Sequence, residues 1–305
     1  MWYNINRTGR LGNRLFSRAH IYAAALELNE TVLDWGLLDS KHYFPNVDAT
    51  KIPIYPLNSE GTHPHLPENI LSNKLSLKFL HVMRPRITGK YWIFWNQHWG
   101  IGDPEKVRVD SLEFKKFNIK NKNIILNGFK LRCPDLVKKH RNQICNYFQI
   151  PKSYSRKWEF LLKNWKKSFS EIIGLHMRAG DFKNAMRGNF YLSPREYAMI
   201  LKDKLEVNWS DTLIILFSDE TFMQNNSWHE VESAFSFTNS IFNNGSILDD
   251  LSGLMHCDKI IGPATSTFSR WAAFSGNKDW VGVSRSLLKS SKKLEFKKCP
   301  IPWDY

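Results

Sequence analysis

The chain has 305 residues, of which 42% are hydrophobic and 24% are charged, proportions that are ordinary for a water-soluble globular protein. No run of residues approaches the roughly 18 consecutive apolar residues that mark a membrane-spanning helix, so we expect no membrane span. The net charge of +14 indicates an anionic partner, and the length suits one large domain or two smaller ones.

The chain begins with a predicted strand, a glycine-containing turn and a helix. Residues 2–5 form the strand, Gly9 and Gly12 lie in the turn, and apolar residues at helical spacing extend to about Leu28. Asn13 is the expected N-cap of this helix. Such a turn presents backbone N–H groups and the positive end of the helix dipole to an anion. The sequence matches neither the P-loop nor the glycine-rich fingerprint of dinucleotide-binding proteins, so a tight turn without a ligand remains the alternative.

The middle of the chain alternates between strands and helices and contains one long proline-rich loop. Strands are expected at 31–33, 91–99 and 124–126, and helices at 134–148 and 157–166. The loop, over 41–70, carries His63 and His65, which without further ligands are not expected to hold a metal. The aromatic strand at 91–99 suits either a hydrophobic core or a platform on which a ligand stacks.

A cluster of polar residues follows a predicted buried strand near Ile172. The strand is a short apolar run, and His176, Arg178 and Asp181 come directly after it. In open α/β sheets, ligands bind in the crevice beyond the carboxyl ends of the strands. An arginine placed there can bind a phosphate through two parallel hydrogen bonds. The alternative is a surface turn in which Arg178 and Asp181 form an ion pair.

The last third of the chain predicts further strands and helices in alternation. A helix follows Pro194, strands are expected at 213–217, 259–262 and 280–283, and a helix is expected between Ile247 and the strand at 259–262. Thr265, Ser266 and Thr267 then cap another helix, an arrangement suited to a phosphate. The alternation predicts parallel sheets.

Two adjacent carboxylates lie near the start of the helix that is expected after Ile247. Asp249 or Asp250 can accept hydrogen bonds from the paired N–H donors of a guanine edge. The alternative is a solvent-facing first turn of a helix, where Asp is common because it interacts favourably with the helix dipole.

Taken together and in this order, the motifs resemble those of the fucosyltransferases that use GDP-fucose. This is the group of α-1,2-, α-1,6- and protein O-fucosyltransferases, and the likeness is closest to the α-1,2 type. The motifs that carry it are Gly9-Arg10-Leu11-Gly12-Asn13, His176-Met177-Arg178-Ala179-Gly180-Asp181, Leu216-Phe217-Ser218-Asp219-Glu220, and the block from Asp250 to Trp271 with its Ser-Thr-Phe-Ser-x-Trp ending.

The resemblance implies an α/β fold of the GT-B type, with two Rossmann-like domains and a cleft between them. We expect an N-terminal acceptor-side domain over 1–155 and a C-terminal nucleotide-sugar-binding domain over 156–305. The tail after about residue 287 is expected to return to the first domain.

The resemblance also implies a glycosyltransferase that moves fucose from GDP-fucose to a glycan hydroxyl. It implies inversion at the anomeric carbon, with no metal and no cofactor beyond GDP-fucose as co-substrate. The implied catalytic residues are Arg178, Asn13 and Asp181, with Asp181 serving either as general base or as the partner that orients Arg178. The implied donor-binding residues are Gly12, Asn13, His176, Arg178, Ser218, Asp250, Thr265, Ser266 and Thr267.

Two departures from the family pattern keep other functions open. Ala179 stands where many members have a second arginine, and no glutamate soon after Asp181 matches the base of the α-1,6 branch. A transferase of the same fold that uses another nucleotide sugar is therefore one alternative. A non-catalytic basic protein that binds nucleic acid or a polyanionic glycan is the other, and strong weakening of its binding by salt would identify it.

The basic residues and cysteines bear on partners and location. No nucleic-acid-binding motif accompanies the lysine-rich tail at 289–298, so we expect a solvated surface and no nucleic acid partner. Peripheral contact with an anionic membrane stays open. Cys133, Cys145, Cys257 and Cys299 lack metal-site spacing, and we expect them to be buried thiols in a reducing compartment. Met1 lies directly before the first strand, so we expect a cytoplasmic protein without a secretory signal.

Overall fold

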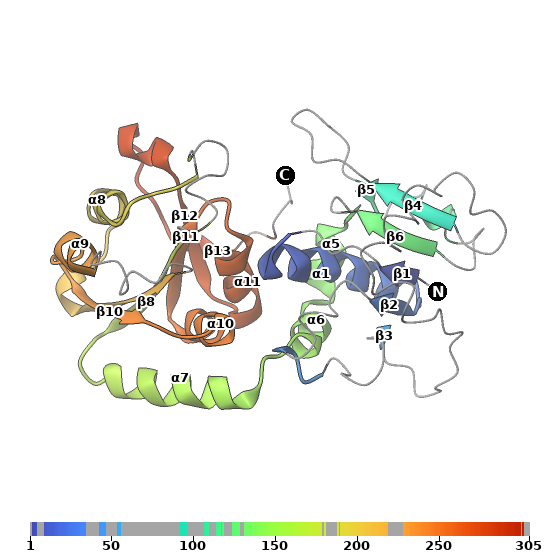
Figure 1. Ribbon diagram of the computed structural model, residues 1–305, viewed down its shortest axis with the longest axis horizontal. Helices are drawn as coiled ribbons and strands as arrows, with labels where there is room; N and C mark the ends of the chain where they lie inside the picture. Colours follow the sequence, from blue (N-terminus) through green and yellow to red (C-terminus); the bar gives the residue numbers. More distant parts are fainter. Residues whose placement is uncertain are drawn as a thin grey trace. The chain divides into compact units, whose positions relative to one another are not determined.

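The computed structural model describes residues 2–4, 9–34, 43–46, 54–55, 92–96, 107–109, 114–116, 118, 124–128, 131–178, 180, 188, 190–218, 228–299 and 301. The described residues divide into two compact units, one over the residues up to Gln149 and the other from Ile150 onward (Figure 1). The sequence-based boundary between 155 and 156 lies inside helix α7 (Lys152–Trp165), which begins directly after its N-cap, Pro151.

The N-terminal unit is built on a five-stranded sheet in the order β3-β2-β1-β6-β4. Its strands are β1 (Trp2–Asn4), β2 (Val32–Asp34), β3 (Ile54–Tyr55), β4 (Trp92–Asn96) and β6 (Ile124–Gly128), and its helices are α1 (Leu11–Glu27), α5 (Pro134–Lys139) and α6 (Arg141–Tyr147). All neighbouring strands are parallel except β3, which is antiparallel to β2. A separate parallel pair joins β5 (Val107–Arg108) to β7 (Leu131–Arg132).

Most predicted elements of this unit are present, with three corrections. The helix expected over 134–148 is interrupted at His140, which is the C-cap of α5 and the N-cap of α6. A short strand, β3, occurs inside the region expected to be loop, because its residues pair with β2. The strands β5 and β7 were not predicted, since two-residue strands carry too little periodicity to be recognised.

The C-terminal unit is a six-stranded sheet in the order β10-β9-β8-β11-β12-β13. Its strands are β8 (Glu171–Met177), β9 (Thr212–Ser218), β10 (Asn239–Asn243), β11 (Lys259–Pro263), β12 (Asp279–Val283) and β13 (Lys297–Lys298). Its helices are α7, α8 (Pro194–Lys204), α9 (Trp228–Ala234), α10 (Ile247–His256) and α11 (Thr267–Gly276), with 3-10 turns at η5 (Trp209–Asp211) and η7 (Arg285–Lys289). The first five strands are parallel and β13 is antiparallel to β12.

Alternate residues of the central strand β8 face two helical layers. Ile173 and Leu175 belong to a core cluster with Tyr197 and Leu201 of α8, on one face of the sheet. Gly174 lies on the other face, where an added Cβ would lie 2.9 Å from the Leu254 side chain of α10. Figure 1 shows this sandwich, with α8 and α9 on one side of the sheet and α10 and α11 on the other. Burial on both faces explains why β8 is an unbroken apolar run.

The strand order places a topological switch point beside β8. From β8 the chain moves outward to β9 and β10 and then returns to form β11 on the opposite side of β8. In such a sheet the crossover connections leave in opposite directions from β8 and β11, which opens a crevice at their carboxyl ends. The fold therefore indicates a ligand site where β8 and β11 end.

Candidate active site

The polar motifs of the C-terminal unit converge on the carboxyl edge of its sheet. Arg178 directly follows β8, Ser218 ends β9, and Ala264 to Ser266 connect β11 to α11. Ser218 pairs in register with Met177, the residue before Arg178. Because parallel strands end on the same side, three motifs that are far apart in the sequence meet at one edge. Asp181 and Asp219 lie outside the described residues.

A contact between His176 and Ser266 links the end of β8 to the start of α11. His176 is only 4% exposed, and its Nδ1 lies 3.2 Å from the hydroxyl oxygen of the fully buried Ser266. The His176 ring also packs against Phe268, with 5.2 Å between ring centroids. Because Gly262 lacks a side chain, Ser269 can approach β11 closely. The glycine thus lets the start of α11 lie against the strand that precedes it.

The start of α11 has the groups that an anion requires. Ser266 is the N-cap, and its hydroxyl accepts the backbone N–H of Ser269. This hydroxyl is committed to the cap and to His176. Thr265 is exposed, while Thr267 is 7% exposed. The first N–H groups of a helix have no partner within it and carry partial positive charge, so this terminus favours an anion beside Arg178.

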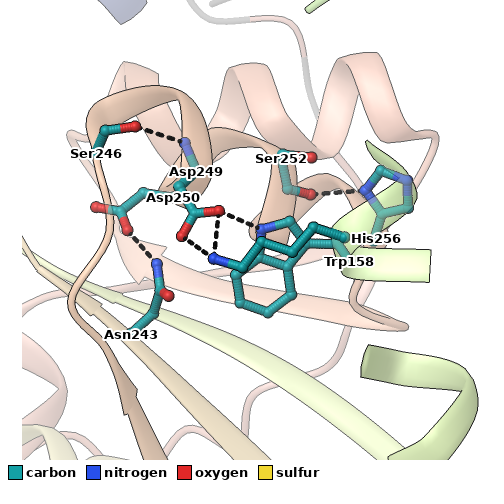
Figure 2. A network of polar contacts seen from close by, with 8 residues as sticks. Trp158, Asn243, Ser246, Asp249, Asp250, Ser252 and His256 are labelled. Carbon is teal, nitrogen blue, oxygen red and sulfur yellow. Dashed lines mark hydrogen bonds and ion pairs between the residues drawn. The ribbon is translucent and has the colours of Figure 1, made fainter. Parts of the chain in front are cut away.

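Asp249 and Asp250 are adjacent in sequence but have different partners (Figure 2). Asp249 is 4% exposed and accepts hydrogen bonds from Lys157 Nζ at 2.8 Å and from Trp158 Nε1 at 3.1 Å. These bonds fix α10 to α7, so we assign Asp249 to holding the two helices together. Asp250 is half-buried and accepts a hydrogen bond of 2.7 Å from Nδ2 of Asn243, the last residue of β10.

The glycine turn of the N-terminal unit starts its helix earlier than the sequence predicts. Arg10, not Asn13, is the N-cap of α1, and Asn13 lies in the first turn, so the predicted capping role is wrong. Gly9 has φ +84°, a conformation that favours glycine, and an added Cβ would lie 2.7 Å from Asn13 Cβ. Arg14 Nε donates to the Gly9 carbonyl oxygen at 2.8 Å. Gly12 is buried within the same turn of helix.

A buried polar network beneath this turn was missed by sequence reasoning. Asp34, at the end of β2, is fully buried, forms an ion pair with Arg18, whose Nε lies 3.0 Å away, and accepts a hydrogen bond of 3.1 Å from Asn4 Nδ2. Burial raises the pKa of Tyr22 well above its ordinary value, and the Asp34 carboxylate raises it further, so the phenol stays protonated and donates to Asp34. Arg18 and Tyr22 are four residues apart and therefore lie on the same face of α1. This spacing is the feature of the sequence from which the network could have been suspected.

The structure adds little to metal or thiol chemistry. Among the described residues, no three His, Cys, Asp or Glu side chains gather as a metal site would, and His63 and His65 lie outside those residues. All four cysteines are free; Cys133 and Cys257 are buried as predicted, whereas Cys145 and Cys299 are only partly buried. Burial raises the pKa of the Cys299 thiol to about 12 and that of Cys257 further. No helix in the described ranges is long and apolar enough to cross a membrane.

Comparisons with known proteins place this site in a family context. Residues 150–301, about half of the chain, match the sequence profile of glycosyl transferase family 11. No curated protein matches the chain by sequence. A GDP complex of a FUT1 mutant from Arabidopsis thaliana has a TM-score of 0.53 and 11% identity over 92% of this chain and 70% of that chain. NodZ fucosyltransferase from Bradyrhizobium has a TM-score of 0.52 and 16% identity over 98% of this chain and 99% of its own.

A third structure, NodZ α-1,6-fucosyltransferase soaked with GDP-fucose, has a TM-score of 0.51 and 16% identity over 98% of this chain and 99% of that chain. Structural likeness at these identities shows the fold. It confirms the predicted α/β fold of the GT-B type. The family match confirms the predicted resemblance and covers the unit in which His176, Arg178 and Ser266 converge.

Proposed function

Since residues 150–301 match glycosyl transferase family 11, the chain is a glycosyltransferase, and we propose that it transfers fucose from GDP-fucose to a hydroxyl group of a glycan acceptor. The observation that carries the proposal is the convergence of Arg178, His176 and the start of α11 at the switch point of the family-matched unit. A diphosphate is the ligand chemistry that an arginine fork and a helix N-terminus favour together.

In the proposed reaction, Arg178 and the α11 amides stabilise the departing GDP. The bond between the anomeric carbon and the diphosphate oxygen breaks, and its electron pair leaves on the diphosphate. Arg178 neutralises this growing charge with its guanidinium, while backbone N–H groups near Thr267 donate hydrogen bonds to it. His176, held by Ser266, borders the same edge, and Thr265 and Ser218 supply hydroxyl groups there.

We assign guanine recognition to Asp250 and keep Asn13 as a ligand of the diphosphate or the fucose. Asp250 lies at the N-terminal end of α10, close to the end of β10, and its carboxylate can accept from both N–H donors of guanine. Uracil has no such donor pair. Asn13 and Gly12 belong to the N-terminal unit and lie in the first turn of α1, where the positive end of the helix dipole favours an anion.

The proposal includes inversion at the anomeric carbon and independence from metal ions. An acceptor hydroxyl attacks from the face opposite the diphosphate, so the configuration inverts in a single displacement. The acceptor proton passes to a general base, for which Asp181 is the named candidate. Arg178 and the α11 amides perform the electrostatic work that a divalent cation performs in other transferases.

The deciding experiment compares nucleotide ligands in a thermal unfolding assay. A ligand that binds the native state raises the melting temperature, by an amount that grows with the logarithm of its concentration relative to its dissociation constant. We expect GDP and GDP-fucose to raise it more than UDP does, and we expect sugar transfer to the acceptor from GDP-fucose but not from GDP-mannose. Preference for UDP, or transfer from GDP-mannose alone, would contradict the proposed donor.

A further inference from the structure

We propose that Asn243 is a positioning residue that orients the Asp250 carboxylate and thereby sets the selectivity for guanine. This inference rests on the proposed function, because it takes Asp250 as the contact of the base. It adds a residue that no motif singled out and that lies seven positions before Asp250, at the end of a different element.

The geometry brings these two residues together across a tight connection. Asn243 ends β10, α10 begins at Ile247, and the backbone N–H of Asp250 donates to the Ser246 carbonyl oxygen at 2.9 Å. The chain therefore folds back so that Asn243 Nδ2 lies 2.7 Å from Asp250 Oδ1. Figure 2 shows the Asp250 carboxylate directed to Asn243, whereas the Asp249 carboxylate is directed to the opposite side, toward Trp158.

The helix that carries Asp250 is itself held in place. Asp249 is bonded to Lys157 and Trp158 of α7, and its backbone N–H donates to the Ser246 hydroxyl oxygen at 3.3 Å. These contacts fix the rotation of α10 and hence the position of the Asp250 Cβ. They leave the last torsion of the Asp250 side chain to be set by its own partners.

That torsion determines whether the carboxylate can accept both hydrogen bonds from guanine. The terminal torsion of Asp is broad, so a carboxylate without a fixed partner samples many orientations. Guanine presents two parallel N–H donors in the plane of the ring, and both carboxylate oxygens must lie in that plane to accept them. A hydrogen bond from Asn243 to Oδ1 restricts the orientation of this plane, and a carboxylate oxygen has two lone pairs, so accepting from Asn243 does not prevent Oδ1 from also accepting from guanine.

The test measures affinities of Asn243→Ala for three nucleotides by calorimetry. GDP offers both donors, inosine diphosphate lacks the exocyclic amine, and UDP lacks the pair. We expect the dissociation constant to rise about tenfold for GDP, by less for inosine diphosphate and not at all for UDP. Asn239→Ala is the matched control, because Asn239 is exposed at the opposite end of β10. It should leave all three affinities unchanged.

A double-mutant cycle separates positioning from a general structural effect. In an Asp250→Ala background, Asn243→Ala should weaken GDP binding no further, because the carboxylate on which it acts is gone. An equal loss of affinity for GDP, inosine diphosphate and UDP would show that the turn has merely been damaged and would overturn the inference.

Failure of the inference can be told apart from failure of the proposed function. Wild-type protein that does not prefer GDP over UDP would contradict the proposed donor. A different set of results would contradict the role of Asn243 alone: the wild-type protein prefers GDP over UDP, Asp250→Ala loses this preference, and Asn243→Ala keeps it.

Discussion

At the scale of single residues, Arg178 is the group on which the proposed chemistry most depends. Arg178→Lys keeps the positive charge but loses the planar fork that binds two phosphate oxygens. We expect the loss of one preorganised donor to cost about 3 kcal/mol of transition-state stabilisation, which is a reduction of kcat/KM by more than a hundredfold. Steady-state transfer kinetics measure it. Arg156→Lys, on the exposed part of α7, is the control, and near-normal turnover in Arg178→Lys would rule out the role.

The same substitution should affect stability at Asp249 and GDP binding at Asp250. Asp249→Asn removes an ion pair with Lys157 and should lower stability by about 1–2 kcal/mol, a modest loss because Lys157 is half exposed and screened by solvent. Asp250→Asn places a donor where guanine needs an acceptor and should weaken GDP binding at least tenfold with little change in melting temperature. Melting curves with and without GDP test both. Unchanged GDP binding in Asp250→Asn would remove the guanine assignment.

At the scale of elements, Gly253 allows α10 to pack closely against β9 and α7. An added Cβ at Gly253 would lie 2.6 Å from Phe217 Cζ and 2.7 Å from Trp158 Cζ2. Alanine gains about 1 kcal/mol in helix propensity, but overpacking costs about 1–3 kcal/mol, so we expect Gly253→Ala to destabilise the protein. Denaturant unfolding measures the change. Ile247→Ala, at an exposed position of the same helix, should have a smaller effect.

Elements with strong local signals were predictable, whereas long-range pairings were not. The apolar run of β8 and the hydroxyl cap of α11 show in the sequence because burial and capping act on neighbouring residues. Asp249 and Asp250 are the same residue type side by side, and only the packing of α7 against α10 distinguishes them. The buried contact between Arg18 and Asp34 likewise depends on where β2 lies in the sheet.

At the scale of the whole molecule, the proposed mechanism predicts that transfer activity is insensitive to metal chelators. Arg178 and the amides of α11 are proposed to stabilise the leaving diphosphate, so transfer should persist in EDTA at close to the untreated rate. A transfer assay after dialysis against EDTA tests this. Activity that disappears and returns with Mn²⁺ or Mg²⁺ would indicate a different class of transferase.

The antiparallel strand β13 has a consequence for the solubility of the protein. An open sheet edge is a template on which another chain can add a strand, and lysines are a common defence. Lys297 and Lys298 pair with Trp280 and Asp279 of β12 and are both exposed, so they close that edge with positive charge. Replacing both with valine should cause concentration-dependent association, visible by light scattering. Replacing Lys289 and Lys292, which lie outside the strand, removes the same charge and should cause no such association. Such a result would assign to part of the basic tail a role in preventing association between sheet edges.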